Sequence, residues 1–276
     1  MTSAFLSPSR DGKTSGKPAL RYVVHEPRKV KEPRHTIVLS HALGCDLTMW
    51  NVLADKLAED CRVIAYDHRG HGQSETAPGP YTMEDLTEDA ARVIQETNSA
   101  PLVWIGISMG GMVGQELALR HPELIAALVI ANSTSRYPDE AQTTWQQRII
   151  TLEQQGIPGI VEATLQRFFS PAFHERDPAT VDAFRRRLLS TELQAYLGCC
   201  HAVRVIDTTE RLPQIRVPVQ IIAGEQDQGT PPAMAKTIAD KIPYAKLAVL
   251  PDAAHLSVIE QPEAFAKVIY SFLREL

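Results

Sequence analysis

Short apolar runs rich in β-branched residues alternate along this chain with longer segments in which apolar side chains recur every three or four positions. The runs predict strands and the longer segments predict helices. This alternation is typical of an α/β fold, in which a mostly parallel central sheet is flanked by helices. The predicted strands are 20–25, 36–40, 62–66, 102–107, 127–131, 219–223 and 246–250, with room for antiparallel strands at the N-terminal edge.

The interval 133–209 breaks this alternation. It has apolar residues at helical spacing, contains no convincing strand, and is divided by Pro158, Pro171 and Pro178. We therefore predict a core made of residues 1–132 and 210–276, and a helical lid made of residues 133–209 that covers one end of the sheet.

Composition narrows the choice of partner and compartment. The 276 residues carry a formal net charge of -5, which leaves no basic excess for holding nucleic acid. The chain has neither the apolar segment of a secretory signal nor a run long enough to span a membrane, so we expect a cytoplasmic protein. Its four cysteines lack the paired spacing of a zinc or redox site, and no metal or organic cofactor is predicted.

The strongest chemical signal is a buried apolar run that leads into Gly106-Ile107-Ser108-Met109-Gly110 and then into a helical segment. A nucleophilic serine on a sharp strand-to-helix turn needs very small residues two positions before and two positions after it. The context therefore predicts Ser108 as a nucleophile, whereas the alternative is a glycine-rich turn in which Ser108 only caps the helix.

A serine hydroxyl needs a positioned base, and the base needs a group that fixes its tautomer. His255 is the best candidate base among nine histidines, because it follows the late strand 246–250 through a loop and precedes a C-terminal helix. Asp227 lies just past strand 219–223, with Glu225 as its main competitor. The place after strand 127–131 holds no carboxylate, which favours Asp227.

The oxyanion of an acyl-transfer reaction requires two backbone N–H groups aimed at one point. The residue after the nucleophile, Met109, is expected to supply the first. Leu43 is expected to supply the second, from the loop Ser40-His41-Ala42-Leu43-Gly44 that follows strand 36–40.

Taken together, these residues resemble the α/β-hydrolase superfamily and, within it, the 3-oxoadipate enol-lactonases. The resemblance runs from about Leu20 to the C-terminal helix. It is carried by LSHALGCDLTMW at 39–50, YDHRGHGQS at 66–74, PGPYT at 78–82, GISMGGMVGQ at 106–115, GCC at 198–200 with Arg204, AHLS at 254–257 and EQPEAF at 260–265. The PGPYT and GCC segments discriminate best, since the others are shared across the superfamily.

The resemblance implies an α/β-hydrolase fold with an inserted lid, and hydrolysis of a small anionic enol-lactone within bacterial aromatic degradation. One departure is His41-Ala42, where this group usually has Asn-Ser. An imidazole beside the oxyanion loop is expected to alter which acyl group fits, so His41 is predicted to contact the substrate.

A substrate carboxylate inside a dry pocket needs a cation, and a guanidinium can satisfy both carboxylate oxygens at once. The lid offers Arg136, Arg148 and Arg204, which we rank in that order because Arg136 follows strand 127–131 and could point toward Ser108. Trp145 is expected to complete the substrate-binding side of the pocket.

Three other functions remain open at this point. A carboxylesterase or a hydrolase of carbon–carbon bonds would use the same scaffold and serine, because one fold hosts many reactions. A non-catalytic ligand receptor would need neither the predicted triad nor the oxyanion loop. The sequence leaves the oligomeric state open.

Overall fold

The computed structural model describes residues 9–276 and contains an eight-stranded sheet in the order β1-β2-β4-β3-β5-β6-β7-β8. β1 pairs antiparallel with β2, β2 pairs antiparallel with β4, and all later pairs are parallel. The strands are β1 (Ser9–Lys13), β2 (Arg21–His25), β3 (Thr36–Ser40), β4 (Arg62–Tyr66), β5 (Leu102–Ile107), β6 (Ile125–Ala131), β7 (Val219–Gly224) and β8 (Lys246–Leu250).

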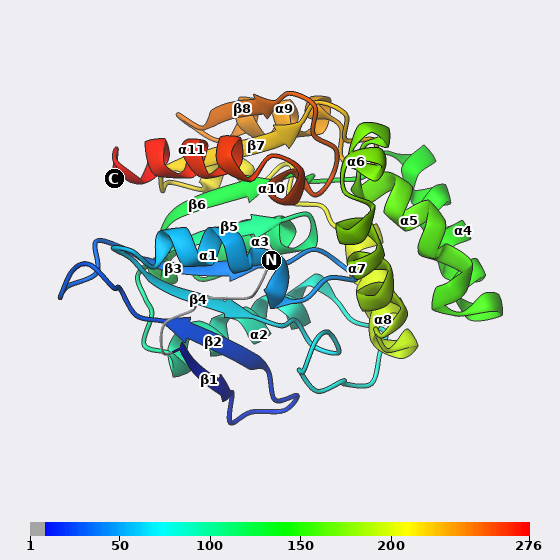
Figure 1. The fold of residues 1–276 in the computed structure, drawn as a ribbon, viewed down its shortest axis with the longest axis horizontal. Helices are drawn as coiled ribbons and strands as arrows, with labels where there is room; N and C mark the ends of the chain where they lie inside the picture. The colour runs from blue at the N-terminus through cyan, green and yellow to red at the C-terminus, as the bar shows by residue number, and fades with distance from the viewer. Residues whose placement is uncertain (1–8) are drawn as a thin grey trace.

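Helices cover the two faces of this sheet. α1 and α11 pack together in front of it, whereas α2 and α3 pack together behind it (Figure 1). The helices outside the lid are α1 (Asn51–Leu57), α2 (Met83–Glu96), α3 (Met109–Arg120), α9 (Pro232–Lys241), α10 (Ser257–Glu260) and α11 (Pro262–Leu273). The predicted fold class, a mostly parallel sheet flanked by helices, is confirmed.

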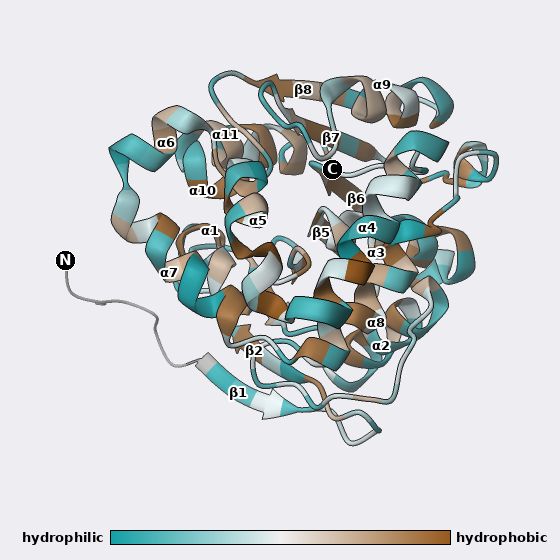
Figure 2. Ribbon diagram, turned by 90° about the vertical axis from the view of Figure 1, so that its right-hand side faces the viewer, coloured by the Kyte–Doolittle hydropathy of each residue, from teal (hydrophilic) through white to brown (hydrophobic). Residues whose placement is uncertain are grey.

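Strand β1 differs most from the sequence prediction, which named no strand before residue 20. Its residues, SRDGK, are hydrophilic, and Figure 2 shows β1 largely in teal. A polar edge strand carries no apolar periodicity, so sequence alone gave only a general expectation of antiparallel strands at this edge. The expected lack of a secretory segment depends in part on residues 1–8, which lie outside the described residues.

Between β6 and β7 the chain forms five α-helices and no named strand. They gather beyond the carboxyl ends of the parallel strands, on the right in Figure 1. The ends of this insertion meet, since Arg136 and Asp207 form an isolated β-bridge and the Thr208 amide donates to the Ser135 carbonyl at 2.9 Å. The helices are α4 (Asp139–Gln155), α5 (Val161–Phe168), α6 (Pro171–Arg176), α7 (Pro178–Leu189) and α8 (Leu193–Arg204).

The PGPYT and GCC segments, far apart in sequence, meet where the lid packs on the core. The Tyr81 amide donates to the Gly198 carbonyl at 3.3 Å, and a Cβ added at Gly198 would lie 2.6 Å from the Tyr81 ring. A close approach of this kind requires glycine at position 198, so the two segments form one lid–core contact.

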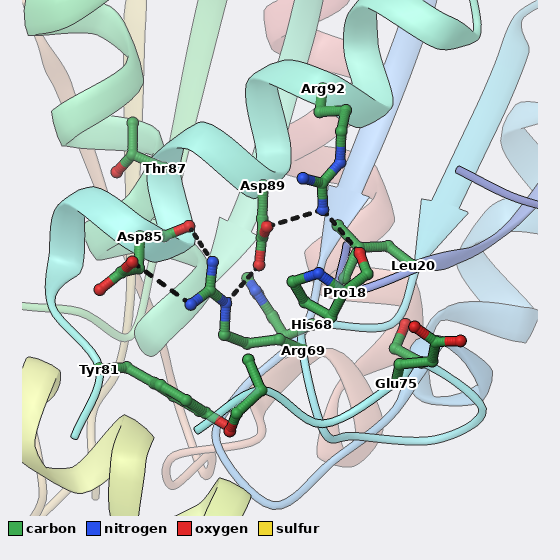
Figure 3. Close-up of polar contacts among 12 residues, drawn as sticks. Pro18, Leu20, His68, Arg69, Glu75, Tyr81, Asp85, Thr87, Asp89 and Arg92 are labelled. Atoms are coloured by element: carbon green, nitrogen blue, oxygen red, sulfur yellow. Dashed lines mark hydrogen bonds and ion pairs between the residues drawn. The ribbon is translucent and has the colours of Figure 1, made fainter. Parts of the chain in front are cut away.

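A buried ion-pair network fixes the loop that follows β4. Arg69 donates to the Asp89 carboxylate at 2.5 Å and to the Asp85 carbonyl at 3.0 Å, and Arg92 links Asp89 to the Pro18 carbonyl (Figure 3). Asp89 is only 1% exposed, so removal of one partner would leave a buried charge unpaired. The network ties the 67–72 loop to α2.

Candidate active site

Ser108 lies on the sharp turn between β5 and α3. Its backbone has φ 55° and ψ -118°, a conformation that residues other than glycine rarely adopt. A Cβ added at Gly106 would lie 2.0 Å from the Gly110 carbonyl oxygen, and one at Gly110 would lie 2.2 Å from the Ser40 carbonyl oxygen. The two glycines are therefore required by backbone contacts, and they let the strained turn form.

Three predicted residues lie in one chain of hydrogen bonds. His255 Nε2 is 2.9 Å from Ser108 Oγ, and His255 Nδ1 is 2.8 Å from Asp227 Oδ2. An ionised carboxylate only accepts, so the His255 proton resides on Nδ1 and leaves Nε2 free to accept from the serine hydroxyl. This is the arrangement that general-base activation of a serine needs.

Asp227 is buried but well satisfied. Its Oδ1 accepts from the Gly229 amide at 2.8 Å and the Thr230 amide at 3.0 Å, and its Oδ2 accepts from the Thr230 hydroxyl at 2.8 Å. Burial alone would raise the pKa of Asp227, but the nearby His255 and these hydrogen bonds hold it below its usual value. The carboxylate is thus ionised at neutral pH.

Asn132 is a supporting residue that sequence reasoning missed. It follows β6 with φ 43°, and its Nδ2 donates to Asp227 Oδ2 at 3.0 Å and to the Ala254 carbonyl at 3.1 Å. Its Oδ1 accepts from the Ser257 hydroxyl at 2.5 Å. Asn132 therefore connects the Asp227 loop to the His255 loop. The sequence signal that could have identified Asn132 was its position directly after the strand that precedes the lid.

The two predicted oxyanion amides flank Ser108. Met109 is the first residue of α3, and Leu43 follows β3 and lines the same cavity as Ser108. Within residues 9–276 neither amide donates to a backbone carbonyl, so both remain available to a ligand. Glu225, the competing acid, is exposed and does not line this cavity.

The cavity at Ser108 lies between the core and the lid and is nearly closed, with a volume of about 10 Å³. Two walls come from the lid helices α4 and α5. The lining residues are Leu43, Ser108, Tyr137, Trp145, Arg167, Phe168, Val203, Gly229 and His255.

Two of the predicted substrate residues lie at or near this cavity. Trp145 lines it, and the Arg148 guanidinium lies 5.8 Å from the Trp145 ring centroid. Arg148 Nη2 donates to the Thr164 hydroxyl and the Tyr196 hydroxyl, both at 2.5 Å. Arg204, in the last turn of α8, is adjacent to the lining residue Val203 but does not itself line the cavity.

The structure does not bring Arg136 to Ser108. Its side chain is 54% exposed, lies 3.8 Å from both Asp139 and Asp207, and lines a separate cavity between the start of the lid and α9. The bridge to Asp207 at the base of the lid explains this outward direction. The first place given to Arg136 in our ranking does not fit this geometry.

His41 is likewise absent from the cavity lining. Its ring is fully buried, and both ring nitrogens are hydrogen-bonded to backbone groups. The expectation of direct substrate contact by His41 therefore does not fit the structure.

Arg167, which we did not single out from sequence, lines the cavity directly. Its guanidinium lies 5.5 Å from the Trp145 ring centroid, and its Nε is enclosed without a hydrogen-bond partner. Burial and the neighbouring Arg148 cation lower the pKa of Arg167. Among residues 9–276, no carboxylate lies within 4.0 Å of either guanidinium. The only sequence signal was that Arg167 precedes the apolar position Phe168.

Comparisons with known proteins concern the fold and the family of this chain. A family model described as alpha/beta hydrolase fold matches residues 35–262. A 3-oxoadipate enol-lactonase of Acinetobacter baylyi is 34% identical over 241 residues, covering 87% of this chain and 89% of that protein. A putative carbamate hydrolase of Rhizobium rhizogenes is 29% identical, covering 87% of this chain and 92% of that protein.

A solved structure has the same fold. The crystal structure of the enol-lactonase from Burkholderia xenovorans superposes with a TM-score of 0.89 at 33% identity, covering 96% of this chain and all of that one (100%). Within residues 9–276, no helix has the length and apolar character needed to cross a membrane. The same residues contain no cluster of three or more His, Cys, Asp or Glu side chains suited to a metal ion.

Proposed function

This chain belongs to the α/β-hydrolase family and, within it, to the 3-oxoadipate enol-lactonases, and we propose that it is a serine hydrolase that opens a small carboxylate-bearing enol-lactone to 3-oxoadipate. The hydrogen-bonded chain from Ser108 through His255 to Asp227 supports a serine nucleophile. The two arginines beside Trp145 support an anionic substrate.

The reaction begins with attack of Ser108 Oγ on the lactone carbonyl while His255 Nε2 takes the hydroxyl proton. The amides of Leu43 and Met109 hold the oxyanion of the tetrahedral intermediate. When the ring C–O bond breaks, the imidazolium returns the proton to the leaving enolate oxygen, which leaves an acyl-Ser108 ester.

Hydrolysis of this ester uses the same groups in reverse order. His255 takes a proton from water, and the resulting hydroxide attacks the acyl carbon. Collapse of the second intermediate expels Ser108 Oγ, which regains its proton from His255. The freed enol tautomerises to the ketone of 3-oxoadipate. Asp227 stays ionised throughout and stabilises the transient imidazolium.

The single observation that carries the anionic substrate is the pair Arg148 and Arg167. Two guanidiniums that lie against one tryptophan ring, with no carboxylate within 4.0 Å of either, are costly to keep partly buried. A bound substrate carboxylate would offset this cost by pairing with the Arg167 guanidinium, whose Nε has no hydrogen-bond partner. Arg167 replaces Arg136 as the first candidate for this role.

The test compares two substrates that differ in one charge: the carboxylated enol-lactone and its methyl ester. Arg167→Met should lower kcat/KM about 10- to 100-fold for the carboxylated lactone, because one charge-assisted contact is lost. The neutral ester should change by less than about threefold. Arg148→Met should show the same preference with a smaller effect, because its Nη2 already binds Thr164 and Tyr196.

Arg136→Met is the matched control, since that arginine is exposed and faces another cavity. It should leave both substrates unchanged. Equal losses on both substrates for Arg167→Met would remove the support for an anionic lactone, and a general carboxylesterase would then be the better proposal.

A further inference from the structure

A cluster of buried histidines outside the proposed triad includes His41 of the oxyanion loop and His68 and His71 of the loop after β4. His41, His68 and His71 are 0%, 0% and 1% exposed. The His41 ring centroid lies 4.6 Å from that of His68 and 5.4 Å from that of His71. None of these rings lines the Ser108 cavity. A buried imidazole cluster beside a reaction site, with no part in the mechanism above, calls for an explanation.

The hydrogen bonds of His41 fix its tautomer. One ring nitrogen, Nδ1, lies 2.8 Å from the Ala42 carbonyl, and the other, Nε2, lies 3.0 Å from the His68 amide. A carbonyl only accepts and a backbone amide only donates. His41 is therefore neutral, with its proton on Nδ1 and its Nε2 as an acceptor.

His71 is fixed in the same way. Its Nδ1 lies 3.1 Å from the Arg69 carbonyl and donates to it, and its Nε2 accepts from the Gly44 amide at 3.2 Å. Arg69 is itself held by Asp89 of α2, so the carbonyl that orients His71 belongs to a fixed loop (Figure 3). Both imidazoles thus connect the oxyanion loop to the loop after β4.

These contacts set the two peptide groups on either side of Leu43. The Ala42 carbonyl and the Leu43 amide belong to one planar trans peptide and point in opposite directions. Holding the Ala42 oxygen with His41, and with the Cys45 amide at 3.0 Å, directs the Leu43 N–H away from the imidazole. The Gly44 amide, in the following peptide, is held by His71.

We propose that His41 and His71 are positioning residues that aim the Leu43 amide at the oxyanion, His41 as a donor and His71 as an acceptor. This inference rests on the proposed function, because it needs Leu43 to bind an oxyanion formed at Ser108. Neither imidazole touches the substrate. His41 therefore affects the reaction through the loop rather than by selecting the acyl group.

The charged and titratable groups around the pair leave both rings neutral in the working range. Asp46 raises and Arg187 lowers the pKa of His41, whereas His41 lowers the pKa of His71 and Asp67 and Asp46 raise it. Burial is the larger influence and lowers the pKa of each ring to about 4. Protonation would turn each accepting Nε2 into a donor facing a backbone N–H.

The test uses substitutions that keep one nitrogen position at a time. An asparagine amide reaches about as far as Nδ1 of histidine, and a glutamine amide reaches about as far as Nε2. His41→Asn keeps a donor for the Ala42 carbonyl, whereas His41→Gln loses it. His71→Gln keeps an acceptor for the Gly44 amide, whereas His71→Asn loses it. The proposal thus predicts opposite preferences at the two positions.

The rates are measured on a neutral p-nitrophenyl ester, so that the arginine pair has no influence. His41→Gln should have a kcat about tenfold or more below that of His41→Asn, and His71→Asn should lie below His71→Gln by a similar factor, with KM little changed. Removal of an oxyanion donor costs about 10²- to 10³-fold, so a misdirected amide should lose part of that.

Urea unfolding of the four variants separates positioning from loss of structure. The inference holds if asparagine is the more active residue at position 41, glutamine is the more active residue at position 71, and kcat does not follow the order of stability. It is overturned if asparagine and glutamine are equivalent at each position, or if kcat follows stability alone. Absence of hydrolysis that depends on Ser108 in the wild-type protein would instead overturn the proposed function, and this inference with it.

Discussion

Acidification from pH 7 to pH 5 is expected to destabilise the folded protein strongly, because its buried histidines resist protonation. Burial lowers the pKa of His41 and of His71 from 6.5 to about 4. The folded pKa is below the unfolded one, so the unfolded chain binds more protons between these values. Stability is therefore full above about pH 6.5 and is lost as the pH falls toward 4.

The size of this loss follows from the two pKa values. A histidine shifted from 6.5 to about 4 contributes about 2 kcal/mol of destabilisation between pH 7 and pH 5, so His41 and His71 together contribute about 4 kcal/mol. Domains are typically stable by about 5–15 kcal/mol, so this loss is a large share. Burial raises the pKa of Asp67 and Asp89, and these carboxyls act in the opposite direction.

Urea unfolding monitored by tryptophan fluorescence at pH 7, 6 and 5 and constant ionic strength measures the effect. The free energy of unfolding should fall with pH, and the pH dependence should weaken by about 2 kcal/mol in His71→Gln. The same substitution at the partly exposed His201 controls for loss of an imidazole. A pH dependence that is the same in His71→Gln as in the wild-type protein would refute the neutral, buried state of His71.

Three further predictions concern the candidate site and the lid. Asp227→Asn should lower kcat by about 10⁴-fold, because an amide facing His255 favours the wrong tautomer; retention of more than a tenth of the activity in a steady-state assay would contradict this. Gly198→Ala should destabilise the lid–core contact by about 1–3 kcal/mol, because its Cβ would meet the Tyr81 ring, and an unchanged unfolding midpoint would disprove it. Ser108→Ala should lose about 10⁴-fold or more in turnover while its circular dichroism stays native, and near-native hydrolysis would exclude Ser108 as the nucleophile.

Most of the sheet could be predicted from sequence because the interior strands are continuous apolar runs. β5 and β7 are buried along their whole length, and such runs are distinctive. β1 lacks that signal because SRDGK is polar, and β6 begins at Ile125 rather than at residue 127. The strand limits are set by pairing with neighbours, which sequence periodicity does not report.

The candidate site was predictable where a residue follows a strand. Ser108, Asp227 and His255 each come just after the carboxyl end of a parallel strand, and the fold brings those ends together. Arg136 also follows such a strand, but a tertiary contact with Asp207 turns it outward.

Residues whose role depends on the packing of the lid were harder to predict from the sequence. Arg167 reaches the cavity only because α5 packs over the loop at Gly229, where an added Cβ would lie 2.8 Å from the Arg167 side chain. The position of Asn132 was considered only as a second place for the acid, where no carboxylate stands, and its bridging contacts depend on two loops that are distant in sequence.

The central claim is that Ser108 is a nucleophile activated by His255, and covalent capture tests it most directly. The folded protein is treated with a fluorophosphonate, and intact-mass and peptide mass spectrometry locate the adduct. The account predicts one adduct per chain on Ser108, with none in Ser108→Ala and much slower labelling in a His255→Ala variant. An unlabelled wild-type protein, or an adduct that persists in Ser108→Ala, would contradict it.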